Sequence, residues 1–180
     1  VKYSGMGGEY KVISLLKYIT DEVGSCGGFP RVPCVPLTAA EKEEVSPSLV
    51  ASVILAESKY KNTAESETGA LGLMQLMPDT ARWVAQQMGH GNYTDRQLKE
   101  PETNIQLGTW YLGYLLKEFN GDEVQALAAY NAGRGHVESW VKEKNWNGMV
   151  DTIPFPETRM YVKTVLTYQE RYESLYGEHH

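Results

Sequence analysis

The chain has 180 residues, 42% of them apolar, and a net charge of −6, which suits one globular domain with a sizeable core. The acidic balance argues against a nucleic-acid binder, and no apolar run of about eighteen residues is present to span a membrane. Twelve Tyr and four Trp against three Phe form an aromatic set that can stack and hydrogen-bond, as a sugar-binding surface requires.

The N-terminal part, residues 1–37, combines a helical pattern over residues 9–23 with a Gly/Pro-rich stretch over 24–37 that predicts a loop. Cys26 and Cys34 flank turn formers, and a loop of that length can bring them within disulfide range, so a bridge in an oxidising compartment stays open. We expect this part to belong to the same globule as residues 38–176.

The ends of the chain carry little further information. No signal-peptide core opens it, so an exported protein would need a leader outside this sequence. Residues 177–180 form a tail in which His179 and His180 are consistent with the stub of an expression tag.

The rest of the chain, residues 38–176, is a series of predicted helices with no strand pattern and no internal repeat. Caps, proline and glycine positions and apolar spacing indicate where they begin and end. The first four expected helices begin at Thr38, begin at Pro47 and end near Glu57, run from Pro78 to Gly89, and follow Thr94. The next four cover residues 104–119, follow Asp122, lie within 134–156, and cover 157–176. The fold class is therefore all-α, with medium helices packed around a central one.

Glu57 is the candidate catalytic residue. Val50, Val53 and Ile54 lie seven, four and three residues before it, on the same helix face. A carboxyl group in apolar surroundings keeps its proton, so its pKa rises, and an acid that is neutral near pH 7 can serve as a general acid. A glutamate that reaches solvent or joins an ion pair at the helix end is the open alternative.

Other catalytic chemistries lack their motifs. The four histidines are scattered, which argues against a zinc hydrolase, and no Gly-x-Ser-x-Gly elbow or phosphate-binding glycine loop is present. A cysteine nucleophile paired with His90 or His136 is disfavoured because both cysteines look structural. Acid–base chemistry by carboxylates remains, and we expect no metal and no cofactor.

Three later segments look organised around Glu57. Gln75 lies among Leu and Met in a loop with two glycines, where it binds either a ligand or the backbone. Tyr130 and Asn131 stand at a helix end, either to read a sugar or to cap the helix. Glu157 opens the last helix, either favoured by the helix dipole or as a second carboxylate in a cleft.

Together these segments resemble the catalytic domain of soluble lytic transglycosylases, the SLT domain, over roughly residues 45–176. The resemblance rests on four motifs in order: Glu57-Ser58-x-Tyr60, Gly69-Ala70-x-Gly72-Leu73-Met74-Gln75-Leu76-Met77-Pro78-x-Thr80-Ala81, Ala129-Tyr130-Asn131-Ala132-Gly133, and Glu157-Thr158-Arg159-x-Tyr161-Val162. It implies a goose-lysozyme-like fold, whose central helix carries the catalytic Glu57.

The resemblance also implies roles. Glu57 would be the single acid/base, and the substrate-binding residues would be Ser66, Gln75, Met77, Tyr130, Asn131 and Glu157. The implied reaction cleaves the β-1,4 bond between N-acetylmuramic acid and N-acetylglucosamine in peptidoglycan and leaves a 1,6-anhydromuramoyl end. The implied setting is the cell envelope, periplasmic or extracellular, with glycan strands as the substrate, a monomeric enzyme, and envelope assembly machinery as a candidate partner.

Two departures and two alternatives accompany this interpretation. Lys61-Asn62 stands where the family usually has Asn-Pro, and residues 1–37 fit the usual lead-in poorly, so they are an appendage or a lid. A lysozyme-like hydrolase on the same fold would need a base such as Glu65, Glu67 or Glu157. A non-catalytic glycan-binding module is the third possibility, although it would have no need of a semi-buried acid.

Overall fold

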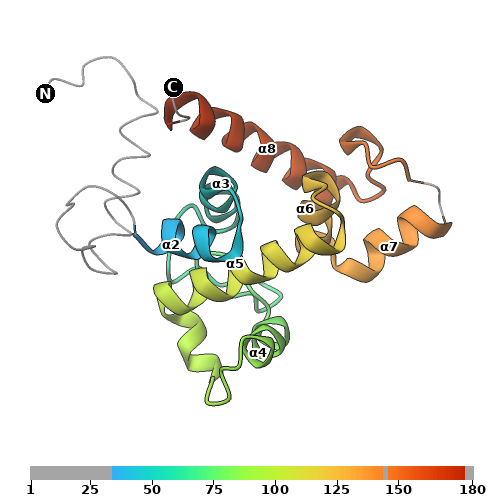
Figure 1. Cartoon of the computed structure of the whole chain (residues 1–180). Helices are drawn as coiled ribbons and strands as arrows, with labels where there is room; N and C mark the ends of the chain where they lie inside the picture. Colours follow the sequence, from blue (N-terminus) through green and yellow to red (C-terminus); the bar gives the residue numbers. More distant parts are fainter. Residues whose placement is uncertain (1–33, 144–145, 177–180) are drawn as a thin grey trace, which may run out of the picture.

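The computed structural model describes residues 34–143 and 146–176, which form a helical fold (Figure 1). The predicted helix over 9–23 and Cys26 lie outside the described residues, so the question of a disulfide between Cys26 and Cys34 stays open. The described part contains two isolated β-bridges, Glu65 with Leu71 and Leu71 with Leu76, and no strand. The predicted all-α class is confirmed.

The helices follow the predicted order. They are α2 (Cys34–Glu43), α3 (Pro47–Ser58), α4 (Pro78–Gln87), the 3₁₀ helix η1 (Asp95–Lys99), α5 (Pro101–Glu118), α6 (Glu123–Ala132), α7 (Arg134–Glu143), the 3₁₀ helix η2 (Val150–Thr152) and α8 (Pro156–Tyr176).

Two predicted helix starts are wrong. The helix expected over residues 104–119 begins three residues earlier, at Pro101. The Gly/Pro-rich loop was expected to last through residue 37, with a helix from Thr38, but α2 already begins at Cys34. Pro36 therefore lies in the first turn of α2, where proline is tolerated because its missing N–H would have no helical partner there.

The predicted helix starts behave differently in detail. Pro47 opens α3 as expected, but the hydroxyl of Ser46 bonds that of Ser48 at 2.6 Å and caps no backbone N–H. Asp122 caps α6, because its carboxylate accepts from the backbone N–H of Gln125 at 3.1 Å. The side chain of Gln97 accepts from the N–H of Thr94 at 2.9 Å, but the helix that follows Thr94 is a short 3₁₀ helix.

Two hydrophobic cores lie on either side of α5, which crosses the middle of the molecule (Figure 1). The large core is built from α2, α3, α5, α6, α7 and α8. The small core joins α4, η1 and the other side of α5 through the set Leu76, Ala81, Val84, Ala85, Leu98 and Leu107. Tyr111 and Tyr130 pack against both cores, so they mark the junction of two lobes.

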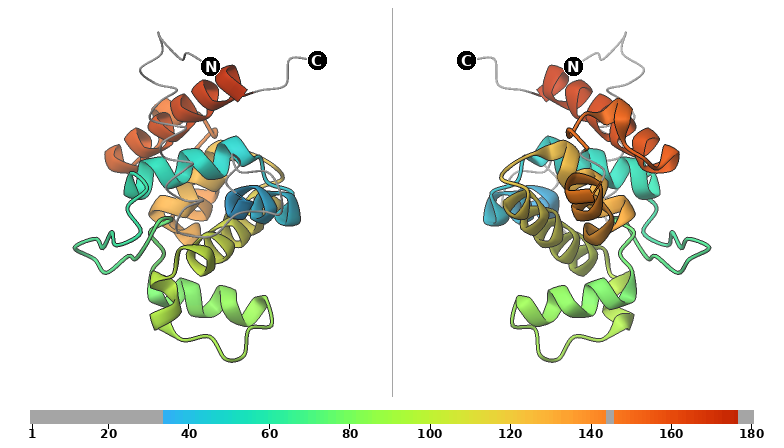
Figure 2. Two further views of the ribbon diagram at one scale, coloured as in Figure 1. Left: turned by 90° about the vertical axis from the view of Figure 1, so that its left-hand side faces the viewer. Right: turned by 90° about the vertical axis from the view of Figure 1, so that its right-hand side faces the viewer.

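The helix α3, which carries Glu57, is enclosed on all sides. Six consecutive residues, 49–54, are buried, which requires neighbours around the whole circumference of the helix. The main neighbour is α8, which packs against α3 at one edge of the molecule (Figures 1 and 2). The hydroxyl of Tyr60 ties the end of α3 to α8 through Tyr172 at 2.9 Å. The chain then leaves α3 in a loop, residues 61–77, that projects from the side of the molecule (Figure 2).

Candidate active site

Glu57 lies one residue before the end of α3, where the buried helix reaches the junction of the lobes. Burial raises the pKa of its carboxyl from 4.5 to about 7, and a hydrogen-bonding interaction with Tyr161 offsets part of that rise. In the described part of the chain, no neighbouring carboxylate contributes to the shift. Glu57 is therefore substantially protonated at neutral pH, as its apolar approach predicted.

Two tyrosines face this carboxyl from different helices. Burial raises the pKa of the Tyr130 and Tyr161 phenols well above 10, and the charge of Glu57 adds to both shifts. The Tyr130 hydroxyl donates to the backbone carbonyl of Met74 at 2.8 Å. The Tyr161 hydroxyl is buried and interacts with Glu57 but, among the described residues, meets no acceptor at ordinary hydrogen-bond geometry. Both phenols stay neutral, and Tyr161 retains a proton to donate toward Glu57 once that carboxyl ionises.

The sequence named Tyr161 only as part of a motif. Its contact with Glu57 comes from the packing of α8 on α3, which joins residues 104 positions apart. The sequence does carry a signal of this contact: Tyr161 is a polar phenol beside Val162 and Val165, which face inward. A phenol in such a position needs a hydrogen-bond partner inside the protein.

Replacing Tyr161 with Phe tests this contact. Because Tyr161 favours the ionised form of Glu57, the Tyr161→Phe protein should carry a Glu57 of higher pKa. We expect the alkaline limb of the pH–rate profile to move to higher pH and kcat to fall about five- to tenfold, the equivalent of one hydrogen bond. Kinetics on purified cell walls between pH 5 and 9 provide the measurement. An unmoved limb with unchanged kcat would contradict the role.

The loop 61–77 is fixed over the helices by the buried residue Met74. Its backbone N–H donates to the side-chain oxygen of Asn104 at 2.8 Å, while its carbonyl accepts from Tyr130. The amide nitrogen of Asn104 donates to the carbonyls of Leu71 and Leu98, both at 2.9 Å. Asn104 is 1% exposed and thus joins the loop, η1 and α5 at one point.

Gly72 is required at this junction. A Cβ there would lie 2.2 Å from the side-chain nitrogen of Asn104, and the residue has φ +79°. No other residue permits both the close approach and this backbone conformation without strain. Asn104, which the sequence offered only as the start of a helix, is therefore a structural determinant of the loop.

The three predicted loop residues differ in their surroundings. The hydroxyl of Ser66 accepts from the backbone N–H of Ala70 at 2.9 Å and bonds Thr68 at 3.0 Å. The amide of Gln75 donates to the carbonyls of Ala64 and Gly72 at 3.1 and 2.9 Å, which matches the alternative of a backbone-bound glutamine. Met77 is 42% exposed and immediately precedes α4, where a ligand can reach it.

The remaining predicted residues lie at the far wall. The side-chain oxygen Oδ1 of Asn131 accepts from the hydroxyl of Thr158 at 2.8 Å, which ties α6 to α8. Glu157 is exposed in the first turn of α8, four residues before Tyr161 and hence on the same side of that helix. The structure thus places Tyr130 where its phenol feels the charge of Glu57, and it places Glu157 one turn from the contact made by Tyr161.

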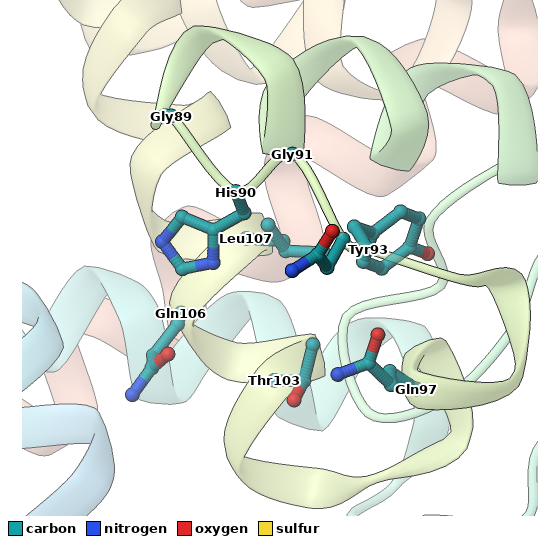
Figure 3. Close-up of a pocket in the computed structure, with 9 residues that line it drawn as sticks. Gly89, His90, Gly91, Tyr93, Gln97, Thr103, Gln106 and Leu107 are labelled. Atoms are coloured by element: carbon teal, nitrogen blue, oxygen red, sulfur yellow. The ribbon is translucent and has the colours of Figure 1, made fainter.

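A separate hollow of about 410 Å³ opens at the other end of α4 (Figure 3). His90 and Gln106 stand on one side of it and Gln97 and Thr103 on another, below the loop of Gly89 to Tyr93. Among the described residues that line it there is no carboxyl group and none of the predicted site residues. We therefore assign the acid–base site to Glu57 and not to this hollow.

Two negative findings concern the described residues. No three His, Cys, Asp or Glu side chains there gather in a way that would hold a metal ion. None of the described helices is both long and apolar enough to cross a membrane.

Comparisons with known proteins agree with the sequence motifs. Residues 35–151 match the family "Transglycosylase SLT domain", and residues 152–180 match "Soluble lytic transglycosylase helical domain". The chain is 39% identical over 141 residues to the soluble lytic murein transglycosylase of Salmonella typhimurium, a match that covers 76% of this chain and 22% of that protein.

Two solved structures are similar to more than three quarters of this chain. One is an inactive Glu-to-Gln mutant of the lytic transglycosylase Slt from Pseudomonas aeruginosa, with 38% identity and a TM-score of 0.73, covering 78% of this chain and 24% of that one. The other is the 70-kDa soluble lytic transglycosylase of Escherichia coli, with 36% identity and a TM-score of 0.75, covering 80% and 24%. The chain spans less than a quarter of the length of these relatives. The motifs, the lysozyme-like fold and these matches show that the chain belongs to the transglycosylase SLT domain family.

Proposed function

We propose that this protein is a peptidoglycan lytic transglycosylase, in which Glu57 is the single catalytic acid and base. The observation that carries the proposal is the half-buried carboxyl of Glu57, whose pKa of about 7 leaves it able both to give and to take a proton near neutrality. Membership of the SLT family supports the choice of substrate.

The reaction would proceed in two proton transfers on one residue. Neutral Glu57 protonates the glycosidic oxygen that leaves from C1 of N-acetylmuramic acid, and the C1–O bond breaks with an oxocarbenium-like centre at C1. The resulting Glu57 carboxylate removes the proton of the C6 hydroxyl of the same sugar. The C6 oxygen bonds to C1 and closes the 1,6-anhydro ring, which restores neutral Glu57 and consumes no water.

The neighbouring residues would assist each stage. Tyr161 stabilises the carboxylate between the two transfers, because its hydroxyl proton has no other described acceptor. Tyr130 and Asn131 form the wall against the reacting sugar, and Ser66, Gln75 and Met77 shape the loop on the other side. Glu157 is assigned to the cleft wall and not to proton transfer.

The hydrolase alternative would need a second carboxylate to activate water. Its candidates Glu65, Glu67 and Glu157 are all exposed, and within residues 34–143 and 146–176 no carboxylate contributes to the pKa shift of Glu57. A site with one raised-pKa acid suits ring closure better than hydrolysis. A binding module without catalysis has no need of a carboxyl group with a raised pKa, so the pKa of about 7 at Glu57 argues against that alternative.

Product mass tests the proposal. Digestion of purified peptidoglycan should release fragments whose muramoyl ends are one water lighter than reducing ends. Fragments with reducing ends would establish the hydrolase instead, and tight binding of wall fragments with no product would establish the binding module. A digest in isotopically labelled water adds a check, because ring closure incorporates no solvent oxygen.

The proposed setting derives from the substrate. Peptidoglycan lies in the cell envelope, so we infer an exported protein that acts there as a monomer, with envelope assembly machinery as a candidate partner. We also infer that residues 38–176 work as one catalytic unit, because α8 packs directly on α3 and α6 and supplies Tyr161 to the site.

A further inference from the structure

An aromatic wall lies beside the candidate active site, where α4 meets α5. It consists of Trp83 from α4 and of Trp110, Tyr111 and Tyr114 from α5. The rings of Trp110 and Tyr114 are stacked with centroids 5.6 Å apart, and Trp83 meets Tyr114 edge to face at 5.1 Å. Trp83 remains 37% exposed, so the wall has a free aromatic surface.

A hollow of about 360 Å³ opens on this wall, a size within the range of small-molecule sites. Asp79, Thr80 and Trp83 line it from one face of α4, because they are three and four residues apart. Tyr111 and Tyr114 line it from α5, and Arg134 from the start of α7. The hollow therefore crosses the junction between the two lobes, as the candidate active site does.

Two connections join this hollow to Glu57. Tyr111 lies against Tyr130 with ring centroids 5.5 Å apart, and Tyr130 in turn feels the charge of Glu57. On the other side, Asp79 and Thr80 follow Met77 by two and three residues at the start of α4. A chain-like substrate at Glu57 can continue along these residues onto the aromatic wall.

The charges around the hollow are already paired. Arg82 bonds both Asp79 and Asp95, while Arg134 contacts Glu118 at 3.4 Å and Glu138 at 3.3 Å. Arg134 also donates to the hydroxyl of Tyr114 at 2.5 Å. Exposed aromatic faces with neutralised charges suit an uncharged ring that also carries hydroxyl groups, and they do not favour a charged peptide.

We propose that Trp83, Tyr111 and Tyr114 form a stacking subsite that holds a sugar ring of the same glycan strand, beyond the rings that Glu57 acts on. This inference rests on the proposed function, since it takes the strand at Glu57 as its origin. The subsite makes Trp83 a determinant of affinity for long strands and leaves the chemistry to Glu57.

Chitohexaose, an uncharged N-acetylglucosamine oligomer without peptide, is the probe. Its binding is titrated in the Glu57→Gln background, which prevents turnover, and the indole N–H signals are followed by NMR. We expect the Trp83 signal to shift while that of buried Trp140 stays in place. Adding Trp83→Ala should weaken binding about tenfold, the loss of one stacking contact, whereas Trp83→Tyr should retain most of the affinity. Thermal unfolding of each variant checks the fold.

Several outcomes overturn the subsite. These are the absence of chitohexaose binding, an unshifted Trp83 signal, or equal affinity in the Trp83→Ala protein. A Trp83 signal that shifts with free stem peptide instead of chitohexaose would assign the wall to peptide. The proposed function is judged separately: if the Trp83→Ala enzyme with intact Glu57 still yields anhydro ends, the function stands whether or not the subsite does.

Discussion

The Glu57→Gln protein should lose roughly 10³- to 10⁴-fold in turnover of peptidoglycan, because one residue performs both proton transfers and glutamine performs neither. The fold should survive, since glutamine has the shape of the neutral carboxyl that the site holds at low pH. Release of anhydro fragments from purified cell walls measures the loss. Clearance at close to the wild-type rate would remove Glu57 from the mechanism.

The same substitution should make the protein more stable above neutral pH. The folded-state pKa of Glu57 is raised, so the stability it contributes is full below pH 4.5 and is lost as pH rises through about 7. A rise from 4.5 to about 7 corresponds to roughly 3 kcal/mol. We therefore expect the Glu57→Gln protein to exceed the wild type by up to that amount at pH 8 and to match it near pH 4.

This pair of results separates a catalytic role from a structural one. A glutamate that merely supported the fold would lower both activity and stability when replaced. Thermal unfolding at pH 4, 6 and 8 gives the comparison, and a gap between the two proteins that does not grow with pH would refute the buried, neutral Glu57. Conversely, the activity of the wild type should decline as pH rises past about 7, because less of Glu57 is then protonated.

Local pattern predicted much of this fold because helix boundaries are local. Pro47, Pro78 and Asp122 each start a helix where their backbone chemistry requires it. The raised pKa of Glu57 was also predictable, since the buried residues Val50, Val53 and Ile54 share its face of α3. The early start of α2 was not predictable from the sequence. A proline is typical of loops but is also tolerated in the first turn of a helix, where Pro36 lies, and the sequence pattern does not distinguish the two.

Contacts between distant segments could not be predicted in the same way. Periodicity shows which face of α8 turns inward but not that Tyr161 meets Glu57 instead of an apolar neighbour. Likewise, Trp83 and Tyr114 look like ordinary amphipathic positions until α4 is placed on α5. The resemblance predicted which segments form the site. Only the structure shows the hydrogen bonds that hold these segments together, such as those of Met74 with Asn104 and Tyr130.

Asn104 shows most clearly how the fold holds the site, and Asn104→Ala should be among the most damaging changes outside Glu57. The substitution leaves the N–H of Met74 without its partner in a buried environment and removes the buried bond to the carbonyl of Leu98. The carbonyl of Leu71 loses one of two bonds, because it also accepts from the backbone N–H of Leu76. At about 1–3 kcal/mol for each buried group left unpaired, partly relieved by relaxation, we expect a loss of roughly 3–5 kcal/mol in the free energy of unfolding. Denaturant titration measures it.

The activity of the Asn104→Ala protein should fall further than its unfolded fraction explains. Met74 holds Tyr130 through its carbonyl, so a loosened loop also displaces the phenol beside Glu57. Misplacement of about 1 Å in a catalytic site costs up to about 100-fold in rate. Kinetics at a temperature where the variant is fully folded, with hydrogen exchange at residues 71–76, should show a slow enzyme with an unprotected loop. The exposed Asn92, replaced by Ala, is the matched control and should change neither quantity. If Asn104→Ala loses stability but keeps full kcat and a protected loop, Asn104 supports the fold alone and the loop owes its position to other contacts.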